Sequence, residues 1–380
     1  MKSALKARGS RSNASDEDEI QSARGPTVRR KARAVTPGRS AGARLAMRGL
    51  GIALLTVTAS AHAPGFGVAP MNDGRTAAVT GLFNWIHSTS DLDRGVAFYR
   101  GVFGLDLVNS PFAAAPATPA APLRPRAEAS SDPLVWDLTG THGSRFRSAF
   151  MRLPGAAFGH ELSEFTGIDQ RTVRANIWDP GATMSIFHVR DIDRVVTALK
   201  EAGAEIITRG GAPVRVGGVR AVVARDPDGH LVQAVESATG GAAIGITVAD
   251  LAATRRFYED VLGFRLETPA GFEREARDLL GMTTGEYRVS AALVPGTSIR
   301  LELYEFRGLP KTPVRWRFQD PGSPQFQFRV RSMDALLAAS QRVGVPFVSA
   351  GQKPIQRAFG RFVFVTDPDG VFVEYVHPKP

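Results

Sequence analysis

The sequence predicts an α+β fold made of four βαβββ units, arranged as two tandem copies of two units each. The first observation behind this prediction is an internal repeat at a constant offset, because the segment 135–165 recurs as the segment 276–306. The second is that each copy divides into two similar halves, in which a strand-like run precedes an amphipathic helix. Self-similarity at a fixed spacing indicates duplicated structural units.

The first half-copy predicts a strand over residues 83–89 and a helix over about 91–102. The apolar stripe of this helix consists of Leu92, Val96, Tyr99 and Phe103. The second half-copy predicts a strand over residues 184–189 and a helix that stops at Ala202-Gly203.

Each helix is followed by two or three alternating strands, such as residues 219–224 and 231–235, which the Asp-Pro-Asp-Gly turn at 226–229 joins. The same turn recurs at residues 367–370, with the same offset as the first repeat. The third unit begins at Ala243 and the fourth at Gln325. The sequence thus repeats the βαβββ order four times.

Upstream of the repeat the offset becomes larger, since Asp91 matches Asp250. The additional residues lie in the Ala/Pro-rich stretch 113–133, which we expect to be a loop present in the first copy only. The predicted domains are therefore residues 82–238, with this insertion, and residues 239–380.

The composition supports a globular protein, since 43% of its 380 residues are hydrophobic and 22% are charged. The absence of cysteine excludes disulfides, thiolate metal ligands and a cysteine nucleophile. The formal net charge of +10 comes mostly from residues 1–48, which hold 12 Lys/Arg and 4 Asp/Glu. Because the rest of the chain holds 35 Lys/Arg and 33 Asp/Glu, we expect no nucleic-acid partner for the folded part.

The N-terminal region has three predicted parts. Residues 1–48 are a disordered basic tail, residues 49–61 resemble the apolar segment of an export signal, and residues 62–81 form a linker. The apolar run is too short for a stable membrane span and ends in Ala-Ser-Ala, so we expect an exported protein, periplasmic or secreted. A start at Met47 would give a compact signal, and an uncleaved tail on a cytoplasmic protein is the alternative.

The helix motifs resemble a known family. Residues 91–107 (DLDRGVAFYRGVFGLDL) and 250–264 (DLAATRRFYEDVLGF) are similar to the first helix and second strand of the vicinal oxygen chelate superfamily. This superfamily includes glyoxalase I, bleomycin resistance proteins and extradiol dioxygenases. The resemblance covers residues 82–377 and implies two glyoxalase-like domains, in which paired units curl into an open barrel around a metal or ligand pocket.

The resemblance also implies where metal ligands would lie. Family ligands occupy the first strand, seven residues before the helix-opening Asp, and a Glu position on a late strand. If the sequence repeats form separate barrels, each site contains one residue that cannot bind a metal. If the first unit pairs with the fourth, as in tandem glyoxalases, one site keeps four oxygen donors and the other is lost. We favour the cross-paired arrangement. Its retained site is Asn84, Glu161, Gln325 and Glu374, and its lost site is Met184, Gln233, Ala243 and Glu302.

The predicted cofactor is a divalent metal, for which Mn, Mg, Ni or Co are the candidates, with no cofactor as the alternative. Oxygen ligands favour hard cations such as Mg²⁺, Mn²⁺ or Ca²⁺ over Zn²⁺. Extradiol dioxygenase chemistry, which needs two histidines on iron, is not expected. The histidines do not change this conclusion, because alternation turns His87 away from the face of Asn84, and no two histidines have metal-ligand spacing.

The implied function is that of a metal-dependent lyase or isomerase acting on a small oxygenated metabolite, with Glu161 or Glu374 as the general base. The alternative is a non-catalytic protein that sequesters a small molecule without metal. Arginines at equivalent positions of the two repeats could bind an anionic substrate group or simply cover strand edges. These are Arg147, Arg288, Arg174 and Arg315. The expected partner is a small molecule, and the chain would be a monomer or homodimer.

Overall fold

The computed structural model describes residues 78–108, 129–153 and 159–379 of the chain. Within these residues it contains five α-helices and two curved mixed sheets, so the predicted α+β class is confirmed. None of the described helices is long and apolar enough to cross a membrane. The predicted tail, export segment and most of the Ala/Pro-rich insertion lie outside the described residues and stay predictions.

The described strands and helices follow the expected order. The strands are β1 (Val79–Thr89), β2 (Asp106–Val108), β3 (Arg145–Arg152), β4 (Gly159–Thr166), β5 (Thr183–Val189), β6 (Val214–Val216), β7 (Val219–Arg225), β8 (Leu231–Glu236), β9 (Gly241–Val248), β10 (Glu286–Leu293), β11 (Arg300–Arg307), β12 (Pro324–Val330), β13 (Ile355–Arg357), β14 (Gly360–Thr366) and β15 (Phe372–Pro378). The helices are α1 (Leu92–Phe103), α2 (Pro133–Thr139), α3 (Ile192–Glu201), α4 (Leu251–Arg256) and α5 (Met333–Arg342).

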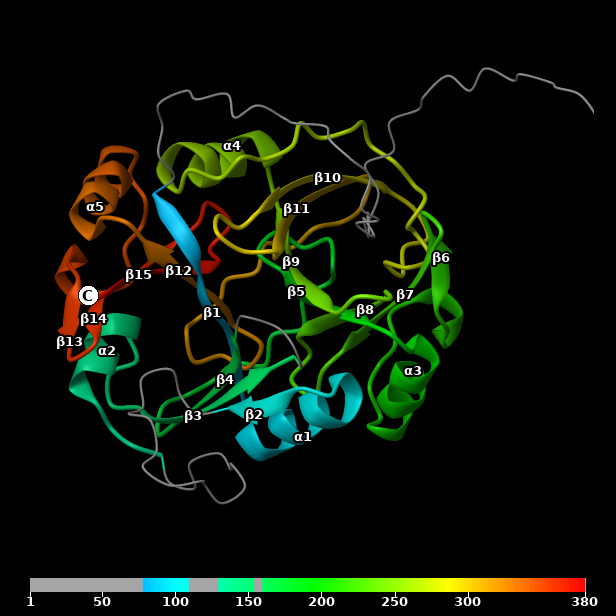
Figure 1. Cartoon of the computed structure of the whole chain (residues 1–380), viewed down its shortest axis with the longest axis horizontal. Coiled ribbons are helices and arrows are strands. Elements are labelled where there is room, and N and C mark those ends of the chain that lie inside the picture. Colours follow the sequence, from blue (N-terminus) through cyan, green and yellow to red (C-terminus); the bar gives the residue numbers. More distant parts are fainter. Residues whose placement is uncertain (1–77, 109–128, 154–158, 380) are drawn as a thin grey trace, which may run out of the picture. The chain divides into compact units, whose positions relative to one another are not determined.

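Each sheet combines strands from both copies of the repeat (Figure 1). The first sheet has the order β13-β14-β15-β12-β1-β4-β3-β2, and the second has the order β10-β11-β9-β5-β8-β7-β6. We call them sheet A and sheet B. Sheet A joins the first and fourth units through the antiparallel pair β1–β12, and sheet B joins the second and third through β5–β9. The two copies therefore exchange halves, and the predicted domain boundaries stay a prediction about sequence units.

The helices begin where the sequence places capping residues. Asp91, Asp191 and Ser332 accept a hydrogen bond from the backbone N–H three residues later, and Asp250 accepts from the N–H groups two and three residues later. A side-chain cap of this kind is worth about 1 kcal/mol and fixes the first turn of the helix. The strand before each cap thus leads into its helix in the same way in all four units.

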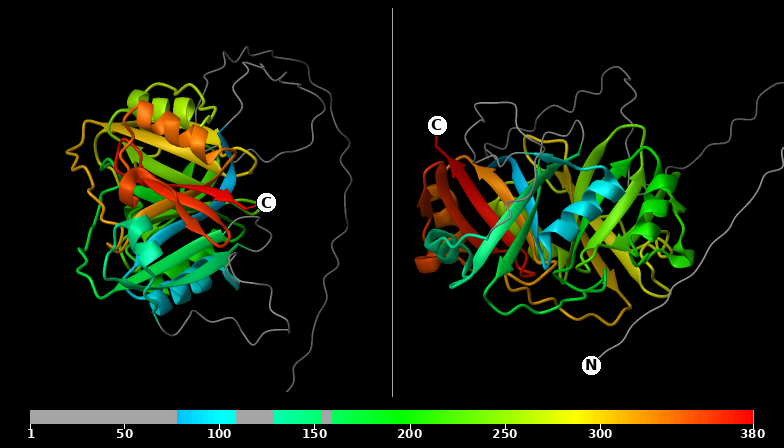
Figure 2. Two further views of the ribbon diagram at one scale, coloured as in Figure 1. Left: turned by 90° about the vertical axis from the view of Figure 1, so that its left-hand side faces the viewer. Right: turned by 90° about the horizontal axis from the view of Figure 1, so that it is seen from below.

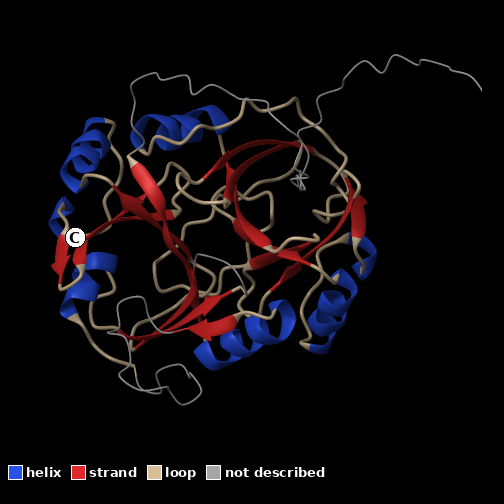
Figure 3. Ribbon diagram, viewed as in Figure 1, coloured by secondary structure: helices blue, strands red, loops and turns tan. Residues whose placement is uncertain are grey.

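Three apolar cores hold the two sheets (Figures 2 and 3). The largest lies between the sheets, where β1 and β12 face β5 and β9, and the Trp85 and Phe187 rings are 5.7 Å apart. The other two cores lie against the opposite faces of the sheets, which we call their inner faces. Helices α1, α3, α4 and α5 contribute their apolar stripes to the central core. The inner faces are consequently free of these helices and can carry sites.

The third unit departs from the predicted βαβββ order. Its helix continues from α4 into a π-helical turn, Phe257–Val261, and no strand follows between residues 262 and 285. Instead, Ala276, Leu279 and Met282 are buried in the core of sheet B. The apolar side chains of this segment are satisfied by packing into sheet B, so the segment has no need to pair as a strand.

Candidate functional site

The strand register places the four predicted oxygen donors on the inner face of sheet A. In the antiparallel pair β1–β12, Asn84 lies opposite Gln327, and Ile86 lies opposite Gln325. In the parallel pairs, Glu161 is the partner of Ile86 and Glu374 is the partner of Gln327. Side chains at paired positions point to the same face of a sheet. The cross-paired units therefore bring residues from both ends of the chain onto one surface.

Asn84 and Glu161 are in direct contact. The Asn84 Nδ2 donates to Glu161 Oε2 at 2.7 Å, and the Ser163 hydroxyl donates to the other carboxyl oxygen at 3.2 Å. Both site residues are buried. Burial raises the pKa of Glu161 to about 7, although these hydrogen bonds act to lower it. This carboxyl group is therefore held in place by neutral polar partners.

Glu374 is the second buried carboxyl group of this face, with a side chain 1% exposed. Burial raises its pKa well above the usual range, and the charge of Glu161 raises it further. The amide of Gln327 is hydrogen-bonded to it and Arg357 acts weakly in the opposite direction. Its Oε2 atom has no hydrogen-bond partner among the described residues. Two carboxyl groups that repel each other in a buried place make a site that favours positive charge.

Gln325 lies one residue pair away from this contact. Its Nε2 donates to Ser88 Oγ at 3.1 Å and to the Ser323 carbonyl oxygen at 2.8 Å. Its neighbours across the sheet are Ile86 and Phe372. The structure thus brings Asn84, Glu161 and Glu374 together and leaves Gln325 at the edge of the group.

Gln327 is a polar residue of this face that the sequence analysis did not single out. It lies between Asn84 and Glu374 in the sheet and is buried. Its equivalent in the first unit is Ile86, so a comparison of repeats could not reveal it as a shared feature. The available clue was its spacing, because a residue two positions after Gln325 on a strand points to the same face.

Several buried oxygen atoms of the inner face lack a hydrogen-bond donor in the described part of the chain. They are Asn84 Oδ1, Gln325 Oε1, Gln327 Oε1 and Glu374 Oε2. Buried polar atoms are nearly always satisfied in folded proteins, so a group of unpartnered acceptors indicates a missing donor or cation. Within the described ranges, no group of three or more His, Asp or Glu is placed to hold a metal. The residues fit a hard divalent cation only if amide oxygens join the two carboxylates.

The equivalent face of sheet B is filled. Tyr304 donates to Glu302 at 2.5 Å, and Arg300 Nε lies 3.5 Å from the same carboxyl group. Met184 and Ala243 are part of an apolar core together with Leu279 and its neighbours. Gln233 is buried, and its Nε2 has no partner among the described residues. Of the four predicted positions on this face, Glu302 alone carries a carboxyl group, and it already has a tyrosine and an arginine.

The predicted substrate-binding arginines are engaged elsewhere. Arg147 pairs with Glu164 and, at 3.0 Å, with Asp93, while Arg288 pairs with Glu305 at 2.5 Å. Both arginines are out of phase with the inner-face residues of their strands. Arg174 forms an ion pair with Glu205. These contacts support the interpretation that they cover the outside of the sheets.

Three histidines meet on the opposite face of sheet A. His87 Nε2 lies 3.1 Å from Asp226 Oδ2, and its ring stacks on His230 at 4.5 Å and lies 5.1 Å from His160. Tyr99 donates to the same Asp226 oxygen at 3.0 Å. As predicted from alternation, His87 points away from Asn84. Their convergence was missed because the three residues come from different strands and turns.

Burial keeps two of these histidines neutral. It lowers the pKa of His230 to about 3, and it lowers the pKa of His160 well below the usual range. Both ring nitrogens of His160 lack a partner among the described residues. In the second copy, the positions of the three histidines hold apolar residues, which are Ile246, Leu301 and Val371. The cluster is therefore a polar variant of a position that is apolar in the other copy.

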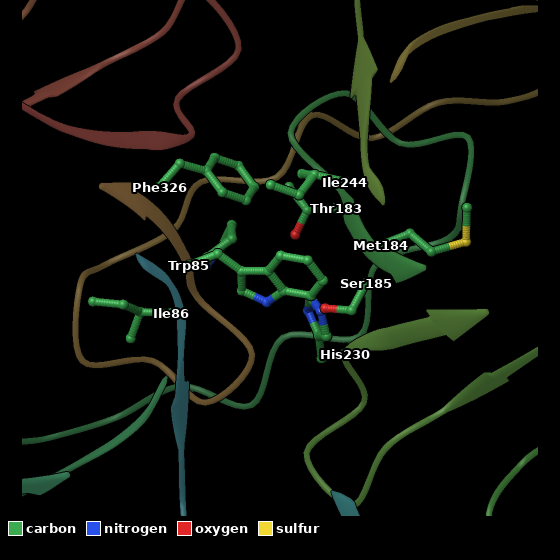
Figure 4. A pocket seen from close by; sticks show the side chains of 9 residues that line it. Trp85, Ile86, Thr183, Met184, Ser185, His230, Ile244 and Phe326 are labelled. Atoms are coloured by element: carbon green, nitrogen blue, oxygen red, sulfur yellow. The ribbon is translucent and has the colours of Figure 1, made fainter. Parts of the chain in front are cut away.

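A small cavity lies beside this cluster, between the two sheets (Figure 4). Its walls include Trp85, Phe326, Ile244, Thr183 and His230. The space for a water-sized probe is about 10 Å³, which corresponds to roughly one water molecule. This cavity is too small for a metabolite.

Comparison with known proteins gives a family match to both copies. The family model described as the Glyoxalase/Bleomycin resistance protein/Dioxygenase superfamily matches residues 84–234 and 242–375. The curated protein Lactoylglutathione lyase GLX1 from Arabidopsis thaliana is 26% identical over 186 residues, which are 48% of this chain and 54% of that protein. The match thus spans about half the length of this curated relative.

Solved structures show a similar fold. Glyoxalase I from Zea mays has a TM-score of 0.50 and 20% identity, covering 78% of this chain and 92% of that chain. A variant of the same maize enzyme in another crystal form has a TM-score of 0.51, also at 20% identity, with the same coverage of 78% and 92%. At this level of identity the similarity concerns the fold and carries no conclusion about the reaction.

Proposed function

The chain belongs to the glyoxalase/bleomycin resistance protein/dioxygenase superfamily, and we propose that the inner face of sheet A binds a divalent cation and catalyses a lyase or isomerase reaction on a small oxygenated metabolite. The observation that carries this proposal is the group of unpartnered buried oxygens around two mutually repelling carboxyl groups of the described chain. The proposed ligands are Asn84, Glu161, Gln325 and Glu374. The curated relative is named for a lyase reaction, which is of the proposed class.

The donor chemistry supports a hard cation such as Mn²⁺ or Mg²⁺, with Ni²⁺ and Co²⁺ as further candidates. Two carboxylates would neutralise a divalent charge, and the amide oxygens would add neutral donors. A bound cation of this kind would hold two substrate oxygens and stabilise negative charge that develops on them.

The protein's own contribution would be proton transfer. A carboxylate at this site would take a proton from a substrate carbon next to a carbonyl group and return it to a neighbouring atom. The pKa of Glu161, about 7, lies close to neutral pH, where a group can both accept and release a proton. Glu374 has an oxygen without a described hydrogen-bond partner that could perform the same task. We propose Glu161 or Glu374 as the general base.

A second candidate function is the binding of an apolar or aromatic small molecule without metal. The observation that favours it is the apolar core beside the polar group, which contains several phenylalanines of the inner face of sheet A. They are Phe165, Phe318, Phe362, Phe364 and Phe372. In this case the polar side chains would orient the ligand through hydrogen bonds.

Titration calorimetry with Mn²⁺ tests the proposal. We expect the full chain to bind Mn²⁺, and we expect Glu161→Gln and Glu374→Gln each to weaken binding about 100-fold, as the loss of a charged ligand requires. Glu302→Gln, which changes the equivalent carboxyl group of sheet B, is the matched control and should leave Mn²⁺ binding unchanged. If the wild-type chain binds none of Mn²⁺, Mg²⁺, Ni²⁺ and Co²⁺, the metal-free function is the correct one.

A further inference from the structure

Two glutamines of β12 compete for one role at the proposed cation site. Gln325 and Gln327 are two residues apart, both are buried, and both point to the inner face of sheet A. Family spacing selects Gln325, because it lies seven residues before Ser332. Their surroundings in the sheet, however, are different in kind.

Gln327 lies in a continuous polar row. Its partner on β1 is Asn84 and its partner on β15 is Glu374, so three adjacent strands place polar side chains next to one another. The Asn84 amide in turn contacts Glu161 at 2.7 Å. Directly paired side chains have their Cβ atoms about 4.5–5.5 Å apart, which is within reach of a shared ligand.

Gln325 lies in an apolar row and is tied down at the strand end. Its partners on the neighbouring strands are Ile86 and Phe372. Both hydrogen atoms of its amide are used, by Ser88 Oγ at 3.1 Å and the Ser323 carbonyl oxygen at 2.8 Å. To reach the carboxyl groups it would have to give up these two buried hydrogen bonds, at a cost of about 1 kcal/mol or more for each.

The amide of Gln327 is already oriented by the site itself. Its hydrogen-bond partner is the Glu374 carboxyl group, and its Oε1 atom has no donor in the described chain although the side chain is only 6% exposed. An acceptor in this position can turn to a cation without breaking a bond to the rest of the protein. The same arrangement holds for Asn84, whose Nδ2 contacts Glu161 while Oδ1 is unpartnered among the described residues.

We propose that Gln327, and not Gln325, supplies the fourth oxygen ligand of the cation site, so that the ligand set is Asn84, Glu161, Gln327 and Glu374. This inference rests on the proposed function. It gives the site two carboxylate–amide pairs, Glu161 with Asn84 and Glu374 with Gln327, one from each end of the chain. Gln325 then serves to fix the β12 strand end through Ser88 and Ser323.

The test compares two variants that differ only in position. Gln327→Met and Gln325→Met both replace a buried glutamine by an apolar side chain of similar length on the same strand face. Mn²⁺ affinity is measured by titration calorimetry, and the coordination of bound Mn²⁺ by electron paramagnetic resonance. We expect Gln327→Met to weaken Mn²⁺ binding about tenfold or more and to change the spectrum, whereas Gln325→Met keeps both the affinity and the spectrum.

A third variant separates an oxygen ligand from a hydrogen-bond donor. Gln327→Glu keeps a side-chain oxygen and removes the N–H group that contacts Glu374. If residue 327 binds the cation, this variant should hold Mn²⁺ at least as tightly as wild type above neutral pH, because a carboxylate is a stronger ligand for a hard cation than an amide. If Gln327 only positions Glu374, the variant should lose affinity like Gln327→Met, and the inference is overturned.

The outcomes also separate this inference from the function on which it rests. Wild-type binding of Mn²⁺ with loss in Gln325→Met and retention in Gln327→Met would overturn the ligand assignment and leave the proposed function standing. Wild-type chain that binds no cation would overturn both. Thermal unfolding of each variant in EDTA verifies that the compared proteins are folded.

Discussion

The inner faces of the two sheets began from equivalent positions and now differ in how their charge is satisfied. On sheet A, burial raises the pKa of Glu161 and of Glu374, and several oxygens lack a donor among the described residues. On sheet B, Glu302 is beside Arg300 and accepts from Tyr304. A buried carboxyl group without a cation costs free energy, so its retention on sheet A has to be explained by something that binds there.

Apolar filling accompanies the loss of donors on sheet B. Where the third unit was expected to form a strand, its chain instead packs Leu279 and Leu280 against the sheet, and both are fully buried. The comparison teaches that a duplicated scaffold can convert one site into core while the other keeps its polar residues. The sheet that lost its site then contributes stability, and we expect the other to carry the chemistry.

The largest expected effect separates these two roles. Leu279→Ala should lower the free energy of unfolding by about 3 kcal/mol, because it opens a cavity in the filled face of sheet B. Mn²⁺ affinity of the folded variant should equal that of wild type. Urea unfolding and calorimetry measure the two quantities. A variant of normal stability with weakened Mn²⁺ binding would show that sheet B takes part in the site.

The two copies also differ beneath their Asp-Pro-Asp-Gly turns, and the difference should appear in the pH dependence of stability. In the first copy, burial lowers the pKa of His230 to about 3, so the unfolded chain gains a proton before the folded one as the pH falls. In the second, burial raises the pKa of Asp367 to about 7, so the unfolded chain loses a proton before the folded one as the pH rises. The first group destabilises the fold in acid, and the second destabilises it towards neutral pH.

The variants His230→Val and Asp367→Asn should each flatten one side of the stability profile. His230→Val, which introduces the residue type of Val371, should remove about 2 kcal/mol of the loss between about pH 6 and 3. Asp367→Asn should remove a similar loss between about pH 4 and 7, while an amide can still bond to Tyr258. Urea unfolding across this range measures both, and profiles that stay parallel to wild type would contradict the assignment of the two groups.

The repeat made the fold readable from the sequence, and the site only in part. The two repeat offsets located all four units, and the capping residues Asp91 and Asp191 marked the helix starts. The choice of cross-paired units followed from which positions had lost their donors, and the strand order of the two sheets agrees with it. The ligand roles themselves stay predictions.

What the sequence could not supply is contact between residues that no pattern links. His87, His160 and His230 are far apart in the chain, and their meeting depends on how the second unit's turn docks on the first unit's strands. Gln327 became a candidate only through the register of β1 with β12. The apolar filling of sheet B arises from a segment without strand or helix periodicity, which propensity rules cannot place.

The smallest expected effect concerns one glycine beside the site. A Cβ at Gly159 would lie 2.8 Å from Asn84 Oδ1, so Gly159→Ala should force the Asn84 amide to turn and break its 2.7 Å bond to Glu161. We expect Mn²⁺ affinity to fall about tenfold, or about 1.4 kcal/mol, measured by calorimetry.

The matched control is Gly241→Ala on sheet B, where a Cβ would lie 2.9 Å from His188 Nδ1 and disturb a side chain that is remote from the carboxyl groups. Both glycines are the first residues of their strands, β4 and β9. The two variants should therefore lose similar stability, while only Gly159→Ala loses Mn²⁺ affinity. Equal affinities in both would mean that the Asn84–Glu161 pair can relax around an added methyl group, and that the position of Asn84 does not limit cation binding.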